Sequence, residues 1–176
     1  MGLIFSINRE HRRLRKINRE NIDKRTFKGC VKMAVVDSIY DGDTITVVTR
    51  LHDNEHYAKY SLRLSDIDAP EVAPVRKTTP NWPLHKEAGI AVRDYLRRYL
   101  PVGSVIQIIF EKEEKYGRLL GNIHKLQYSY FRMKYVQCDN VNQHLLEMGL
   151  VVPYGGNAKE TFSEQQLNDI ILKSHS

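Results

Sequence analysis

The sequence predicts an α+β domain, mainly β, with five strands and three helices. Its 176 residues, 41% of them hydrophobic, suit one ordinary core but not two full domains. From Cys30 onward, alternating or β-branched apolar runs occur in five stretches, a pattern typical of strands. Three other stretches show helical spacing or helix-capping residues. We therefore divide the chain into a basic arm, residues 1–29, and a folded domain, residues 30–176.

The five strands follow one another with clear turn signals. They are predicted over residues 30–40, 44–50, 56–67, 104–111 and 117–126. Asp41-Gly42-Asp43 separates the first two, and Asp-Gly between alternating runs is a strong hairpin signal. Asp43 is therefore expected at the start of the second strand.

Helices are predicted over residues 84–100, 141–148 and from 164 onward. The proline-rich stretch 73–83 before the first helix is expected to be a surface loop. Asn140 is a capping residue for the second helix, which ends at Gly149. Ser163 and Gln166 predict a capping box at the start of the third.

Charge and composition narrow the class of partner. The net charge of +6 favours a polyanionic partner, which both nucleic acid and an acidic membrane surface provide. Two cysteines are too few for a multi-disulfide scaffold. No apolar run approaches the roughly 20 residues that cross a bilayer, and no signal-peptide core is visible. We expect an intracellular, cytoplasmic monomer.

Acidic residues gather where strands are predicted to begin and end. Asp41 and Asp43 occupy one turn, and Asp66, Asp68 and Glu71 follow the third strand. Calcium takes six to eight oxygen ligands, so two carboxylates from different strands can form a partial site that keeps several waters. The alternative is plain turn chemistry, which accounts for either motif taken alone.

Two arginines favour phosphate chemistry beside these acids. Arg63 lies five residues before Asp68 on the same predicted strand, and Arg118 begins the fifth strand. Two guanidinium groups can bind phosphoryl oxygens through paired hydrogen bonds, and they stay charged at any working pH. Taken singly, each arginine is better explained as a surface or salt-bridging residue.

The order of motifs DGDT, RLSDIDAPE, KYGR and NQHLLEMGL, within residues 31–154, resembles the staphylococcal nuclease family. The resemblance implies a five-stranded OB-type barrel with three helices, which matches the element count above. It also implies calcium-dependent hydrolysis of phosphodiester bonds in DNA and/or RNA that leaves 3′-phosphate ends.

The resemblance also implies a role for each matching position. Asp43 and Asp68 would ligate Ca²⁺ through their carboxylates, and Ala69 through its backbone carbonyl, where the family often has threonine. Asp41 would be a nearby carboxylate that adds negative charge without ligating the metal. Glu71 would take a proton from the attacking water or orient it.

The remaining positions concern the substrate. The resemblance implies that Arg63 and Arg118 hold the scissile phosphate. Lys115 and Tyr116 look like the pair that flanks the nucleotide, and Tyr154 like an aromatic that packs on the base. Around Tyr154 the sequence departs from the family, so a tyrosine packed in the core or a loop is an equal alternative.

The competing class is a non-catalytic nucleic-acid-binding OB module. Such modules usually lack several of the acidic and arginine positions. This chain has Asp43, Arg63, Asp68, Glu71 and Arg118 in order, which favours the enzyme.

Two segments lie outside the motifs. Residues 124–139 interleave aromatic and basic residues, as in surfaces that bind single strands. An extended hairpin whose tyrosines face the barrel is the favoured interpretation, because Tyr128 and Tyr130 alternate. The N-terminal MGLIFS fits a myristoylation pattern with Gly2 as acceptor, and the basic residues after it could support membrane attachment or add nucleic-acid affinity.

Overall fold

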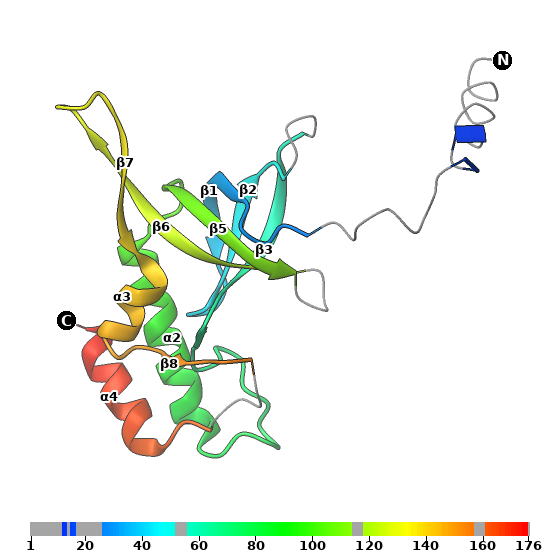
Figure 1. Cartoon of the computed structure of the whole chain (residues 1–176). Helices are drawn as coiled ribbons and strands as arrows, with labels where there is room; N and C mark the ends of the chain where they lie inside the picture. Colours follow the sequence, from blue (N-terminus) through cyan, green and yellow to red (C-terminus); the bar gives the residue numbers. More distant parts are fainter. Residues whose placement is uncertain are drawn as a thin grey trace.

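A computed structural model describes residues 12–13, 15–16, 26–51, 56–113, 118–156 and 161–175 (Figure 1). Its strands are β1 (Val31–Ile39), β2 (Thr44–Thr49), β3 (Ala58–Leu64), β4 (Ile67–Asp68), β5 (Val105–Glu113), β6 (Leu119–Ser129), β7 (Lys134–Asn140) and β8 (Val152–Pro153). Its longer helices are α2 (Trp82–Tyr99), α3 (Val141–Glu147) and α4 (Glu164–Ser174).

Five of the strands form a closed barrel. The sheet order is β3-β2-β1-β5-β6-β7, and all these neighbours are antiparallel. A parallel pairing of β3 with β6, which places Leu62 opposite Leu119, joins the two ends of the five-strand set. The structure therefore confirms the mainly β, OB-type barrel with three helices. It also confirms the hairpin at Asp41-Gly42-Asp43, since β1 and β2 pair antiparallel on either side.

The core lies inside the barrel and continues beneath it. Alternate residues of the strands, such as Ile45, Leu62 and Ile108, are fully buried there. From α2, Val92 and Leu96 are also fully buried and belong to the same apolar cluster. Figure 1 shows the three helices gathered at one end of the barrel, with α4 beside α2. This end carries the loops that form the candidate site.

The helix boundaries follow local capping chemistry. The Asn140 side chain accepts the Gln143 backbone N–H at 3.1 Å, as predicted. Both bonds of the Ser163–Gln166 capping box are present. The prediction for α2 was two residues late, because Pro83 lies inside its first turn. Proline is tolerated there, since the first helical N–H groups have no partner within the helix.

A stack of rings fixes α3 and β7 to α2. The Tyr99 ring lies parallel to the His144 ring with centroids 4.0 Å apart, and the Tyr99 hydroxyl donates to Asp139 at 2.9 Å. The Lys125 ammonium lies 4.0 Å from the Tyr99 ring centroid. Burial, aided by the Asp139 carboxylate, raises the pKa of Tyr99 well above its usual value. The phenol therefore stays protonated and keeps donating.

The prediction for residues 124–139 was right about the hairpin and wrong about the direction of Tyr128 and Tyr130. The segment forms the β6–β7 hairpin, but Tyr128 and Tyr130 do not face the barrel. Tyr128 is 38% exposed, and Tyr130 is 86% exposed in the turn. The physical reason is length: the hairpin extends past the barrel, so its far end has no core to face (Figure 1).

Candidate active site

The site lies where β3 ends and the chain turns back. Asp66 adopts a left-handed backbone conformation, with φ of 62°, between β3 and β4. Aspartate tolerates this region better than most residues. We predicted one continuous strand through Ile67, in which residues five apart lie roughly 16 Å from each other and on opposite faces. The turn instead brings Asp68 back to Arg63.

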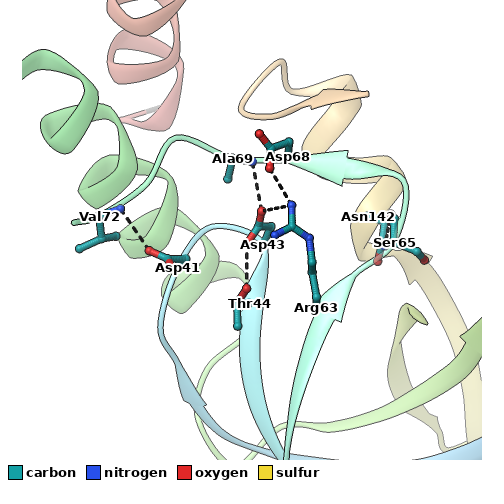
Figure 2. A network of polar contacts seen from close by, with 9 residues as sticks. All are labelled: Asp41, Asp43, Thr44, Arg63, Ser65, Asp68, Ala69, Val72 and Asn142. Atoms are coloured by element: carbon teal, nitrogen blue, oxygen red, sulfur yellow. Dashed lines mark hydrogen bonds and ion pairs between the residues drawn. The ribbon is translucent and has the colours of Figure 1, made fainter. Parts of the chain in front are cut away.

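Arg63 joins two carboxylates from different strands (Figure 2). One of its terminal nitrogens, Nη2, lies 2.6 Å from Asp68 Oδ1 and 3.2 Å from Asp43 Oδ2. All three side chains are buried, with Arg63 7%, Asp43 5% and Asp68 2% exposed. Because one nitrogen reaches both carboxylates, their oxygens converge on a single point.

Further hydrogen bonds orient the Asp43 carboxylate. Its Oδ1 accepts the Thr44 hydroxyl at 2.9 Å, and its Oδ2 accepts the Ala69 backbone N–H at 3.3 Å. Asp43 stands at the start of β2, and Ala69 follows β4 directly. The β1–β2 turn and the segment after β4 are therefore tied together at this carboxylate.

The side chains at this point supply some of the oxygen ligands that a hard cation needs. Asp43 and Asp68 supply buried carboxylate oxygens, the ligand type that calcium prefers. In the described part of the chain, no group of three or more His, Cys, Asp or Glu side chains is arranged to hold a metal ion. Any cation at this point would thus need main-chain carbonyls and water in addition to the two carboxylates.

Asp41 holds the segment that carries Glu71. Its Oδ1 accepts the Val72 backbone N–H at 3.1 Å (Figure 2). Asp41 is itself buried, at 9% exposed, whereas Glu71 is exposed. The sequence-based role for Asp41 was added negative charge, and the structure gives it a hydrogen-bonding role as well.

A cavity of about 170 Å³ opens beside Glu71 and Asp68. Its lining also contains the buried His85 of α2 and Phe162, whose rings meet edge to face with centroids 5.5 Å apart. Threonine side chains at positions 78, 79 and 161 complete the polar part of the lining.

Tyr154 lies against Arg63. Its backbone N–H donates to the Asp66 carbonyl at 2.9 Å, next to the short ribbon in which β4 pairs with β8. The Arg63 guanidinium carbon lies 5.5 Å from the Tyr154 ring centroid, within cation–π range. The structure thus brings this tyrosine to the arginine and the carboxylates.

Arg118 immediately precedes β6, whose first residue pairs with Leu62 of β3. Arg63 therefore lies on one of the two strands that close the barrel, and Arg118 lies directly before the other. Lys115, Tyr116 and Gly2 lie outside the described residues.

Sequence reasoning missed Asn142, a buried polar residue of α3. Its Nδ2 donates to the Ser65 carbonyl at 2.9 Å, and its Oδ1 accepts the Ile123 backbone N–H at 3.2 Å. It therefore ties α3 to β6 and to the turn that follows Arg63. The signal was an asparagine on the apolar side of a short helix, and such a residue needs partners when buried.

Gly42 and Gly89 were also missed as site residues. A Cβ at position 42 would lie 2.5 Å from Val92 and 2.9 Å from Ala69. A Cβ at position 89 would lie 2.5 Å from the Glu71 carbonyl oxygen. The signal at Gly89 was a glycine in a helix interior, which lowers helix stability and so needs a packing reason.

The fold and the site define an OB-type barrel protein with a carboxylate and arginine cluster at one end of the barrel. The chain belongs to the staphylococcal nuclease family, since the model of that family, "Staphylococcal nuclease homologue", matches residues 61–171. No curated protein matches the chain in sequence. Membership indicates a nuclease or nucleic-acid-binding function.

Proposed function

We propose that the protein is a calcium-dependent nuclease that hydrolyses phosphodiester bonds in DNA and/or RNA. The observation that carries the proposal is the convergence of Asp43 and Asp68 on the Arg63 guanidinium, inside a family of nucleases and nucleic-acid-binding proteins. A binding module has no need of two buried carboxylates, because carboxylates repel the nucleic-acid backbone.

In the proposed metal site, Asp43 and Asp68 hold the ion through their carboxylates and Ala69 through its carbonyl. A bound calcium ion would supply Lewis-acid polarisation of a phosphoryl oxygen. Because two carboxylates leave most calcium positions to other oxygens, the site has room for water and for substrate.

The chain's own residues do the remaining work. Glu71, exposed beside the cavity, accepts a proton from the attacking water or orients it. Arg63 and Arg118 bind the phosphoryl oxygens, where negative charge grows during the reaction. Asp41 keeps Glu71 in place through the Val72 N–H. Cleavage that leaves a 3′-phosphate belongs to this proposal.

The substrate extends on both sides of the phosphate. In the proposal Tyr154 packs on a base and Lys115 and Tyr116 flank the same nucleotide; the contact of the Tyr154 ring with Arg63 supports this. The cavity lined by His85 and Phe162 accommodates the chain beyond Glu71.

Membrane attachment through acylated Gly2 remains a separate proposal based on the N-terminal pattern. None of the described helices has the length and apolar character needed to span a bilayer. Incubation with labelled myristate and its transferase tests the proposal. Failure of Gly2 to accept the myristoyl group would end it.

The deciding experiment compares the wild type with Glu71→Gln on single-stranded DNA and RNA, with calcium and with a chelator. We expect wild-type cleavage only with calcium and a loss of about 10²-fold or more in Glu71→Gln. Glu87→Gln, a change at an exposed glutamate of α2, is the matched control.

A second readout separates metal binding from catalysis. Calcium should raise the melting temperature of the wild type but not that of Asp43→Asn/Asp68→Asn, because a ligand stabilises only the state that binds it. Nucleic-acid binding without cleavage in every condition would identify the protein as a non-catalytic module.

A further inference from the structure

The turn of the β6–β7 hairpin exposes three large apolar side chains. Phe131 is 98% exposed, Tyr130 86% and Met133 80%. Single exposed apolar residues are common on soluble proteins, but a cluster of them marks a site of interaction. We call residues 130–134 the hairpin tip.

Local contacts hold the hairpin tip in a defined turn. Ser129 Oγ accepts the Arg132 backbone N–H at 3.3 Å, and Met133 adopts a positive φ of 48°. At its base, the rings of Tyr128 and Tyr130 meet edge to face with centroids 5.1 Å apart. These contacts hold the chain reversal that presents Phe131 to solvent.

The charge around the tip has one sign. Arg132 and Lys134 are exposed beside the apolar side chains. Residues 125–138, which make up most of the hairpin, contain three Lys or Arg and no Asp or Glu. This stretch therefore attracts an anionic surface without a nearby carboxylate to oppose it.

We propose that the hairpin tip inserts into the surface of an anionic phospholipid bilayer. Phe131 and Met133 would enter the boundary between headgroups and acyl chains, while Tyr130 stays at headgroup depth. Arg132 and Lys134 would contact the lipid phosphates.

The shape of the tip favours lipid over a nucleic-acid strand. Bases stack on aromatic rings set along a positively charged groove that follows the backbone. Here the apolar side chains occupy a turn at the end of a projecting hairpin, and one of them is methionine, which offers no ring (Figure 1).

The position of the tip leaves the candidate active site open. The Gly121 carbonyl accepts the Ser65 N–H next to that site, and Tyr130 lies nine residues further along the extended chain. At about 3.3 Å per residue the separation is roughly 30 Å. Figure 1 shows the hairpin extending away from the end of the barrel that carries β4 and β8. A tip in the membrane therefore leaves the candidate active site on the aqueous side.

The test is sedimentation of the full-length, non-acylated protein with two kinds of vesicle, one of phosphatidylcholine and one of phosphatidylcholine mixed with phosphatidylserine. We expect binding to the mixed vesicles that weakens with salt. Phe131→Ser should lower the partition coefficient by roughly tenfold or more. Val102→Ser, which removes a 66% exposed valine from another loop, should leave it unchanged.

Insertion depth has its own readout. The fluorescence emission of Phe131→Trp should shift to shorter wavelengths when the mixed vesicles are added. The wild type, which has one tryptophan, is the reference. Equal sedimentation of wild type and Phe131→Ser, or an unshifted Phe131→Trp spectrum, would overturn the proposal. So would loss of single-stranded DNA affinity in Phe131→Ser without vesicle binding by the wild type, since the tip would then be a nucleic-acid surface. Nuclease activity is expected to be the same in all these variants, so failure here leaves the proposed function standing.

Discussion

Gly89 of α2 lies directly against the main chain of Glu71. An added Cβ would come within 2.5 Å of the Glu71 carbonyl oxygen and 2.7 Å of the Pro70 carbonyl oxygen. The backbone of the segment that carries the proposed general base therefore rests on a helix that has no side chain at the contact.

Replacing this glycine should move Glu71. In Gly89→Ala, helix propensity gains about 1 kcal/mol, but overpacking against rigid backbone costs about 1–3 kcal/mol. We expect a lower melting temperature and a larger proportional loss in kcat than in substrate affinity. Gly155→Ala is the control, because nothing lies within 4 Å of a Cβ there. Unchanged kcat in Gly89→Ala would show that Glu71 does not depend on this contact.

Asp41 offers a comparison between charge and hydrogen bonding. Asp41→Asn keeps an oxygen that can accept the Val72 N–H, whereas Asp41→Ala removes it. We expect Asp41→Asn to retain most activity and Asp41→Ala to lose about tenfold or more, because a displaced catalytic group has a large kinetic effect. Steady-state kinetics on one substrate decides the matter. Equal losses in both variants would instead assign Asp41 a purely electrostatic role.

Arg63 should mask the effect of calcium on stability. Its guanidinium neutralises the Asp43 and Asp68 carboxylates, at 3.2 and 2.6 Å, where the cation is proposed to bind. Arg63→Gln should lower the free energy of unfolding by about 3–5 kcal/mol, as breaking a buried ion pair does. It should also enlarge the rise in melting temperature on adding calcium.

The matched control for Arg63 is Lys59→Gln, which breaks the more exposed Lys59–Asp37 pair. That change should alter stability by no more than about 1 kcal/mol. A calcium shift of equal size in the wild type and Arg63→Gln would contradict the proposed cation position. Scanning calorimetry with calcium and with chelator measures both quantities.

His124 should make the fold sensitive to mild acid. Burial lowers the pKa of His124, and the Gln137 amide N–H group that faces its Nδ1 at 2.6 Å fits a neutral ring. The stability that the neutral His124 ring contributes is fully present above the unfolded-state pKa of about 6.5. It is lost as pH falls through the lower pKa of the folded state. We therefore expect stability to decrease with falling pH below about 6.5.

His124→Gln should flatten that part of the stability profile, as measured by urea unfolding at several pH values. His175→Gln, at an exposed histidine that caps α4, should leave the profile of the wild type. If His124→Gln and the wild type lose stability in parallel below pH about 6.5, other groups control the acid response.

Features that depend on residues close together in the chain could be predicted from the sequence, whereas features that join distant residues could not. Asn140 and Ser163 were predicted as caps because a cap depends on residues three positions away. The hairpin at Gly42 follows equally local turn chemistry. The parallel contact of β3 with β6, by contrast, joins residues far apart in the chain, and it entered the prediction only through the family resemblance.

The candidate site was predicted as a set of residues but not as an arrangement. The turn at Asp66 was absorbed into a strand, because residues 64–67 contain no glycine or proline to mark a turn. The sequence signals of Gly89 and Asn142, a glycine inside a helix and a polar residue on an apolar helix side, do not identify the groups that these residues contact. Their importance comes from what approaches them in three dimensions, namely the Glu71 main chain and the turn after Arg63.

The parallel pairing of β3 with β6 has a consequence for the order in which the protein acquires its chemistry. A chain emerging from the ribosome displays Asp43, Arg63, Asp68 and Glu71 well before Arg118 and the strand that follows it. Until that strand is made, β3 lacks its partner and the proposed pair of phosphate-binding arginines does not exist. A growing polypeptide in which β6 has not yet been made would therefore lack the proposed nuclease activity.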